Sequence, residues 1–239
     1  MTQEKIGLVK QEIEILKICQ HPNLIRMLDI FEDFEHIYIV MEILHGGDLL
    51  HYLEKHKFKI PEQRAAQIIK SLAEGLHYLH SYGILHRDIK PENILMIDQN
   101  EDSDVKIADF GLSKLVGPLQ LSNEPFGTLT YLAPEILLKQ PYGKKVDVWS
   151  LGVITYLMLL GVLPFECEDD QELAQLLIYT EPDYDSLMWK KVSKEGLDFV
   201  KSILFNSLLE LLIKDQEKRI SLREVLQHPW IKKTYKSIK

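Results

Sequence analysis

A polar loop in the middle of the chain holds residue types that can act on a hydroxyl and on a migrating anion. Within "GILHRDIKPENILM", residues 83–96, Asp88, Lys90 and Asn93 lie close together between apolar flanks. A fixed carboxylate can orient a hydroxyl and accept its proton, and a nearby lysine can neutralise an anion. An amide oxygen joined by a second carboxylate can hold Mg²⁺. Asp109, in "VKIADFGLSK", supplies that second carboxylate.

The composition of the chain limits the classes of protein to which it can belong. The chain has 239 residues, 46% of them apolar, which is enough for one sizeable globular core. A net charge of -8 argues against nucleic acid as a partner held through phosphate contacts. Cys19 and Cys167 form neither a disulfide nor a zinc pattern, which favours a reducing compartment, the cytoplasm or alternatively the nucleus.

No segment predicts a membrane protein. The most apolar run, "LGVITYLMLLGVL" at 151–163, is shorter than the roughly 20 residues that cross a bilayer. It therefore predicts a helix buried on all sides. The first residues mix acids with lysines and lack the apolar core of a secretory signal, so we expect no membrane association.

Hydrophobic periodicity predicts the elements that position the polar loops. A β-containing front is joined near residue 44 to a larger helical body, and the polar loops follow that junction, where clefts tend to form. We expect an amphipathic helix at 7–19, a hairpin of strands at 24–31 and 36–43, a helix from Pro61 to a stop at Gly83, mostly loop and short strand to 135, and helices thereafter.

Several motifs together resemble the eukaryotic protein kinases. "HRDxKxxN" at 86–93 is followed by "DFG" at 109–111, "APE" at 133–135 and "DVWSLGV". "GTLTYLAPE" resembles the serine/threonine branch, and "GGDLL" and "VLQHPWI" are closest to the calcium/calmodulin-dependent group. The resemblance implies an α+β, bilobal kinase fold. Residues 1–43 would form a truncated small lobe, with its C-helix and two strands, and residues 44–239 a complete, mainly helical large lobe.

The resemblance assigns catalytic roles to the residues of the opening loop. Asp88 would be the catalytic base, and Lys90 would contact the γ-phosphate of ATP. Asn93 and Asp109 would bind Mg²⁺, and Thr128 would shape the substrate floor beside Asp88 and Lys90. The implied reaction is transfer of a phosphoryl group from ATP to serine or threonine of protein substrates.

The same resemblance implies a nucleotide site at the junction between the lobes. Met41 would stand at the gate to the back pocket, backbone groups of Glu42 and Leu44 would face adenine, and Leu95 would lie beneath the ring. Glu12 matches the helix glutamate that pairs with a strand lysine. Each of the hinge residues can equally be read as core or linker.

Substrate choice and regulation are implied by four further charged residues. Asp48 and Glu92 stand where basophilic kinases receive a basic residue upstream of the phosphoacceptor, unless they are merely solvated acids. Glu124 would give Arg87 a standing negative charge in place of a phosphate, unless it too is only solvated. Calcium or calmodulin regulation fits the group, although the chain shows neither an EF-hand loop nor an obvious calmodulin-binding helix.

Other residues resemble the scaffold of the family rather than its chemistry. Glu135 and Arg219 would form a buried ion pair, and Asp147 would cap the backbone of the catalytic loop. A packed stack is implied for Leu16, Met27, His86 and Phe110. His86 is therefore not expected to accept the substrate proton.

The chain also departs from the family pattern. It has no GxGxxG, and no strand lysine precedes Glu12 at the usual spacing. We expect a fragment of a longer kinase or an incomplete gene product. The alternative is a pseudokinase or protein-binding module that uses its bare sheet edge. The segment "LFNSLLEL" at 204–211 also looks inserted relative to the family.

Overall fold

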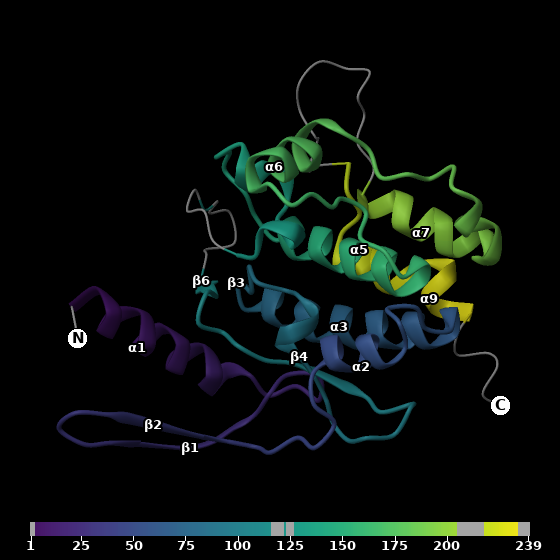
Figure 1. Cartoon of the computed structure of the whole chain (residues 1–239). Coiled ribbons are helices and arrows are strands. Elements are labelled where there is room, and N and C mark those ends of the chain that lie inside the picture. Colours follow the sequence, from purple (N-terminus) through teal and green to yellow (C-terminus); the bar gives the residue numbers. More distant parts are fainter. Residues whose placement is uncertain (1–2, 116–121, 123–126, 205–217, 234–239) are drawn as a thin grey trace.

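The computed structural model describes residues 3–115, 122, 127–204 and 218–233, and it has an α+β fold dominated by helices (Figure 1). In chain order the helices and strands are α1 Gln3–Ile18, β1 Met27–Glu32, β2 Ile37–Met41, α2 Leu49–Lys55, α3 Glu62–Ser81, β3 Ile84–Leu85, β4 Ile94–Met96, β5 Val105–Ile107, β6 Lys114–Leu115, α4 Pro134–Leu137, α5 Lys145–Leu160, α6 Asp170–Tyr179, α7 Lys194–Leu204, α8 Leu222–Gln227 and α9 Pro229–Lys233. Short 3₁₀ helices cover Pro91–Asn93, Leu129–Tyr131 and Leu187–Lys191.

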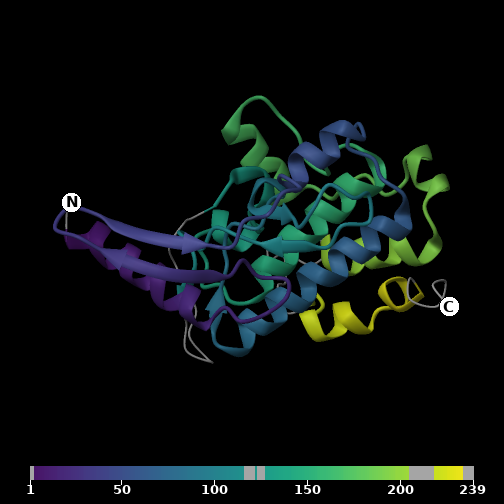
Figure 2. The ribbon, with the colours of Figure 1, turned by 90° about the horizontal axis from the view of Figure 1, so that it is seen from below.

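The front of the chain is α1 lying beside the β1–β2 hairpin, and both extend away from the helical body (Figures 1 and 2). The hairpin is antiparallel, with Ile30 opposite Ile39. Its turn is held by the Asp33 carboxylate, which accepts the backbone N–H groups of Glu35 and His36 at 2.8 and 2.7 Å. The predicted hairpin is confirmed, and the predicted helix begins four residues earlier than position 7.

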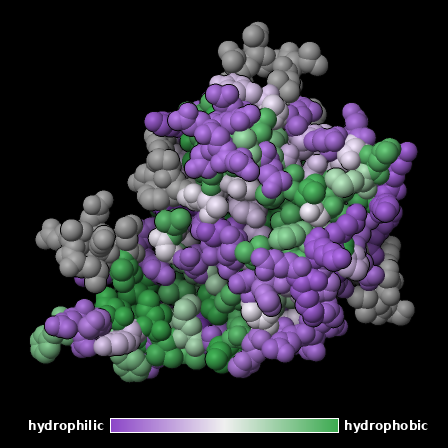
Figure 3. Space-filling view, viewed as in Figure 1, coloured by the Kyte–Doolittle hydropathy of each residue, from purple (hydrophilic) through white to green (hydrophobic). Residues whose placement is uncertain are grey.

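The β1–β2 hairpin exposes much of its apolar side-chain surface. Leu28, Phe31, Tyr38 and Val40 are 54, 56, 50 and 39% exposed. Hydrophobic surface is visible over this part of the molecule in Figure 3. Within the described residues β2 pairs only with β1, so its other edge has no neighbouring strand. The sequence of β2, "IYIVM", contains neither a charge nor a proline.

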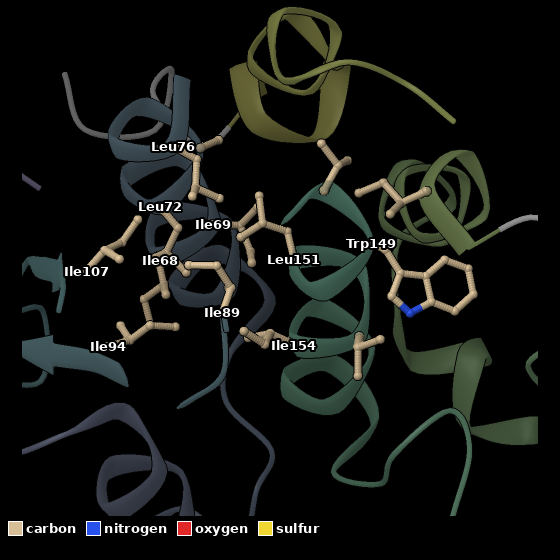
Figure 4. Close-up of a cluster of buried hydrophobic side chains, with 14 of the residues drawn as sticks. Ile68, Ile69, Leu72, Leu76, Ile89, Ile94, Ile107, Trp149, Leu151 and Ile154 are labelled. Atoms are coloured by element: carbon tan, nitrogen blue, oxygen red, sulfur yellow. The ribbon is translucent and has the colours of Figure 1, made fainter. Parts of the chain in front are cut away.

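The core of the helical body lies between α3 and α5. Ile69 of α3 faces Leu151 of α5, Leu72 and Ile154 belong to the same cluster, and all four are fully buried (Figure 4). Every residue of α5 from Val146 to Leu160 is buried, which confirms the helix predicted to be buried all round. Among the described helices, none is both long and apolar enough to cross a membrane.

The junction between front and body is packed tightly against β4. The N–H groups of His45 and Gly46 donate to the carbonyls of Ile97 and Met96 at 3.1 and 3.2 Å. A Cβ atom on Gly46 would lie 2.2 Å from the Asp98 carbonyl oxygen, so only glycine allows this approach. The chain that leaves β2 is therefore fixed on the strand that follows the polar loop of residues 86–93.

A buried ion pair fastens α4 to the C-terminal helices. Arg219 donates to both carboxylate oxygens of Glu135, at 2.8 and 3.1 Å, and to the Lys145 carbonyl at 2.7 Å. Its guanidinium lies 4.9 Å from the ring centroid of Trp149. The predicted pair is confirmed. Ser221 and Glu224 form a capping box at the start of α8. Residues 205–211 of the suspected insertion lie outside the described residues.

Candidate active site

The loop between β3 and β4 is held from beneath by one buried carboxylate. Asp147, in the first turn of α5, accepts the backbone N–H groups of His86 and Arg87 at 3.0 and 2.8 Å. His80 of α3 donates to it at 2.7 Å. Burial alone would raise the pKa of Asp147, but the hydrogen bond and charge of His80 hold that pKa below its usual range. The predicted capping role of Asp147 is thereby confirmed.

Asp88 is the centre of a hydrogen-bond network built by three other predicted residues. Its Oδ1 accepts from the backbone N–H and the hydroxyl of Thr128, both at 3.1 Å. Its Oδ2 accepts from Asn93 Nδ2 at 2.9 Å and lies 3.1 Å from Lys90 Nζ. Lys90 also donates to the Thr128 hydroxyl at 2.7 Å. The structure therefore brings together residues that are up to 40 positions apart in sequence.

Asp109 follows β5 and presents an exposed carboxylate next to this network. Its backbone has a positive φ of 60°, and its Oδ1 accepts the N–H of Gly111 at 3.1 Å. Just before it, the N–H of Ala108 donates to the Asn93 carbonyl at 2.9 Å, which joins the two segments. The segments that carry Asn93 and Asp109 are thus joined by a backbone hydrogen bond.

His86 and Phe110 are packing residues. Their rings meet edge to face, with centroids 5.3 Å apart, and both side chains are buried. His86 Nε2 donates to the Ala108 carbonyl at 3.1 Å, and burial lowers the pKa of the imidazole despite the nearby carboxylate of Asp147. This confirms that His86 packs against Phe110, and it is consistent with the prediction that His86 does not accept the substrate proton. Leu16 and Met27 belong to the same hydrophobic core.

Helix α1 carries Glu12 to the segment that contains Asp109. Burial, and then the negative charge of Asp109, raise the pKa of Glu12. A Cβ atom on Gly111 would lie 3.2 Å from Asp109 Oδ1 and 3.9 Å from Glu12 Oε2, so the two carboxylates face the same small space. Gln11 donates to the Ser113 carbonyl at 3.2 Å and fixes α1 there. No sequence motif predicts this contact.

The predicted adenine-facing residues lie along the junction. Met41 ends β2 opposite Met27, and Leu95 lies on β4, half-buried. The carboxylate of Glu42 accepts from Lys106 Nζ at 2.7 Å, and its N–H donates to the Arg26 carbonyl at 3.0 Å. Because its side chain and its N–H already form hydrogen bonds within the protein, the backbone group of Glu42 that can face adenine is its carbonyl oxygen. Leu44 follows it in the stretch before α2.

The two acids predicted to receive a basic substrate residue have different surroundings. Asp48 is the N-cap of α2, where its carboxylate accepts the N–H of His51 at 2.7 Å. An aspartate directly before the apolar pair "LL" was a sequence signal for this cap. Glu92 is exposed in the 3₁₀ helix, close enough that its charge, after burial, helps to raise the pKa of Tyr131.

Of the predicted regulatory pair, the structure describes Arg87 but not Glu124. Arg87 donates through Nε to the Leu112 carbonyl at 2.6 Å and through Nη1 to the Tyr142 hydroxyl at 3.4 Å. Glu124 lies outside the described residues, so its pairing with Arg87 stays a prediction.

Comparison with known proteins identifies the family. The protein kinase domain family matches residues 1–231. Calcium/calmodulin-dependent protein kinase type 1 of Macrobrachium nipponense is 39% identical over 223 residues, which cover 93% of this chain and 62% of that protein. The type 1B kinase of Rattus norvegicus is 39% identical, over 95% of this chain and 63% of that protein.

A plant relative gives the same result. CDPK-related kinase 3 of Arabidopsis thaliana is 40% identical over 94% of this chain and 36% of its own length. The chain spans less than two thirds of the length of each of these three relatives. The match over residues 1–231, the assembled loop around Asp88 and these identities show that the chain belongs to the protein kinase family, within its serine/threonine, calcium/calmodulin-dependent group.

Proposed function

We propose that this chain forms the catalytic part of a kinase that transfers the γ-phosphoryl group of ATP to serine or threonine of protein substrates. The observation that carries the proposal is the network around Asp88. Thr128, Asn93 and Lys90 hold its carboxylate from three sides, and only 8% of the residue is exposed. A general base needs such a fixed position because the acceptor hydroxyl must be within hydrogen-bond reach.

The donors near Asp88 suit Mg²⁺ and nucleotide. Asn93 donates its amide N–H to Asp88, which leaves its side-chain oxygen as an available acceptor, and the Asp109 carboxylate is exposed. Two protein oxygens are a typical share for Mg²⁺, which also keeps water and phosphate oxygens as ligands. When bound, ATP and Mg²⁺ would supply the transferable phosphoryl group and neutralise its charge.

The residues of the chain have distinct tasks in this proposal. Asp88 orients the substrate hydroxyl and takes its proton. Thr128 keeps the carboxylate aimed through two hydrogen bonds, of which one comes from the backbone. Lys90 Nζ lies 3.1 Å from Asp88 Oδ2 and brings a positive charge that would offset the negative charge of the phosphoryl group during its transfer. Such catalysis consists mainly of positioning and electrostatic stabilisation.

We propose protein substrates with a basic residue upstream of the phosphoacceptor. Exposed Glu92 directly precedes Asn93 in the loop, and a carboxylate paired with arginine in a bidentate geometry is a strong contact. Asp48 uses Oδ1 to cap α2, so its charge remains available at the surface. Because relatives are named calcium/calmodulin-dependent protein kinases, we propose calmodulin as a regulator of the whole protein. We also propose a cytoplasmic location for it.

A radiolabel-transfer assay tests the reaction. The purified chain is incubated with [γ-³²P]ATP, Mg²⁺ and a serine peptide with an upstream arginine. Asp88→Asn is compared with Asp102→Asn, a change at an exposed aspartate. We expect Asp88→Asn to lower kcat at least about 10²-fold, the usual minimum for a lost general base. Equal rates for the two variants, or transfer that does not need Mg²⁺, would refute the proposal.

A further inference from the structure

A pocket separate from the candidate active site lies where α3 ends and α5 and α8 begin. It has a volume of about 310 Å³, and none of the residues that we propose for phosphoryl transfer lines it. His80 of α3 forms part of one wall and donates at 2.7 Å to Asp147, which in turn holds the catalytic loop. The pocket thus adjoins a support of the active site without opening into it.

The rim of this pocket is positively charged. Lys144, Lys145 and Arg223 all line it, and no acidic residue is among the described residues that do. The nearest acid along α8, Glu224, accepts the N–H and the hydroxyl of Ser221, both at 2.7 Å, and its negative charge offsets part of the charge of Lys145. Lys144 and Arg223 are both exposed, and two cations beside one hollow attract an anion.

The floor of the pocket is apolar. Val148 of α5 and Leu222 of α8 line it and are 1 and 4% exposed, respectively. The volume lies at the lower end of the range for small-molecule sites, roughly 300–1,000 Å³, and suits one aromatic or branched aliphatic group. A ligand that matches both halves has an apolar body that reaches the floor and an anionic head at the rim.

We propose that this pocket binds an organic phosphate or carboxylate with a small apolar body. The anion pairs with Arg223 and Lys144 at the rim, while the apolar group packs on Leu222 and Val148. The same chemistry is found in a free small molecule and in a phosphorylated aromatic side chain of a peptide, so the test includes both. The proposal is independent of the phosphoryl-transfer activity.

Calorimetric titration of the full chain with phenyl phosphate tests the charged rim. We expect saturable binding of one molecule per chain. Arg223→Glu and Lys144→Glu should each weaken that binding about tenfold, because each replaces an attractive charge by a repulsive one. Lys190→Glu makes the same charge change at an exposed site outside the pocket, on the 3₁₀ helix Leu187–Lys191, and serves as the matched control.

A neutral variant tests the pocket itself. Ser81 is an exposed lining residue at the end of α3, so Ser81→Trp should fill the mouth, leave the net charge unchanged and abolish binding. Unchanged circular dichroism and melting temperature would show that each variant folds. Binding by Ser81→Trp equal to wild type, or losses in Arg223→Glu no greater than in Lys190→Glu, would overturn the proposal.

Two further ligands identify the source of the anion. Inorganic phosphate should bind more weakly than phenyl phosphate, because it lacks the apolar body, and equal affinity would overturn the role of the floor. A peptide that carries phosphotyrosine should bind more tightly than phenyl phosphate if the natural ligand is a protein side chain. Equal affinity of these two would support the site with a free small molecule as its ligand.

Discussion

Removing Arg219 should cost this protein a large part of its stability. Glu135 is 1% exposed and receives two hydrogen bonds from the Arg219 guanidinium, which also serves the Lys145 carbonyl. In Arg219→Ala the glutamate stays buried with its partner gone. Breaking a buried ion pair from one side typically costs about 3–5 kcal/mol, because the remaining charge is neither solvated nor paired.

The expected loss is measurable by two methods. A destabilisation of about 4 kcal/mol is a large fraction of the roughly 5–15 kcal/mol that stabilises a typical domain. For a chain of this size it should lower the melting temperature by about 10 °C. Urea unfolding, followed by circular dichroism, gives the free energy directly. Arg223→Ala, an exposed arginine in the same helix region, should change it by no more than about 0.5 kcal/mol.

A double-mutant cycle separates the pair from other effects of the arginine. If the cost comes from the stranded glutamate, Arg219→Met combined with Glu135→Leu should recover much of what Arg219→Met loses. Additive losses would show that the two side chains do not act together. A loss in Arg219→Ala no larger than in Arg223→Ala would refute the reasoning.

Three further predictions concern single carboxylates. Burial raises the pKa of Glu12, so its charged form is disfavoured in the folded state; Glu12→Gln should melt higher at pH 7, and the gain should vanish as the pH falls below about 4. Because the pKa of Asp147 is depressed in the folded state, its ionised carboxylate stabilises the fold above about pH 4, and this stabilisation is lost on further acidification. Asp147→Asn should therefore lower the free energy of unfolding by about 3 kcal/mol at pH 7 and by little at low pH, measured by urea unfolding. Asparagine also caps helices, so Asp48→Asn should keep its melting temperature while KM for an arginine-containing peptide rises about tenfold; an unchanged KM would contradict the substrate role.

The sequence predicted the parts of the site that are local in the chain. The loop from His86 to Asn93 is short and bounded by apolar strands, so its residue types revealed their neighbourhood directly. The buried α5 and the hairpin followed from runs of apolar residues with a clear length and period. The match of ordered motifs then supplied Thr128 and the pair of Glu135 and Arg219.

Contacts between distant segments were beyond sequence reasoning unless a motif named them. The bond from Gln11 to the Ser113 carbonyl and the pair of Lys106 with Glu42 depend on how α1 and β5 meet the junction. Neither polar residue has a distinctive sequence context. Asp48 shows another limit, since an acid before an apolar run fits a helix cap and a substrate contact equally well. Only the hydrogen bond from the N–H of His51 to its carboxylate shows that Asp48 caps the helix.

The exposed β1–β2 hairpin bears on how the protein behaves at high concentration. Edge strands in soluble proteins usually carry a lysine, a proline or a bulge that discourages pairing with other chains. β2 has no lysine or proline, and the register irregularity of the hairpin lies at its base, between Met27 and Asp29 of β1. Phe31 and Tyr38 add exposed apolar surface to the hairpin. Self-association of this chain should therefore begin at the hairpin, by pairing of β2 with a strand of a second copy, rather than on the helical body.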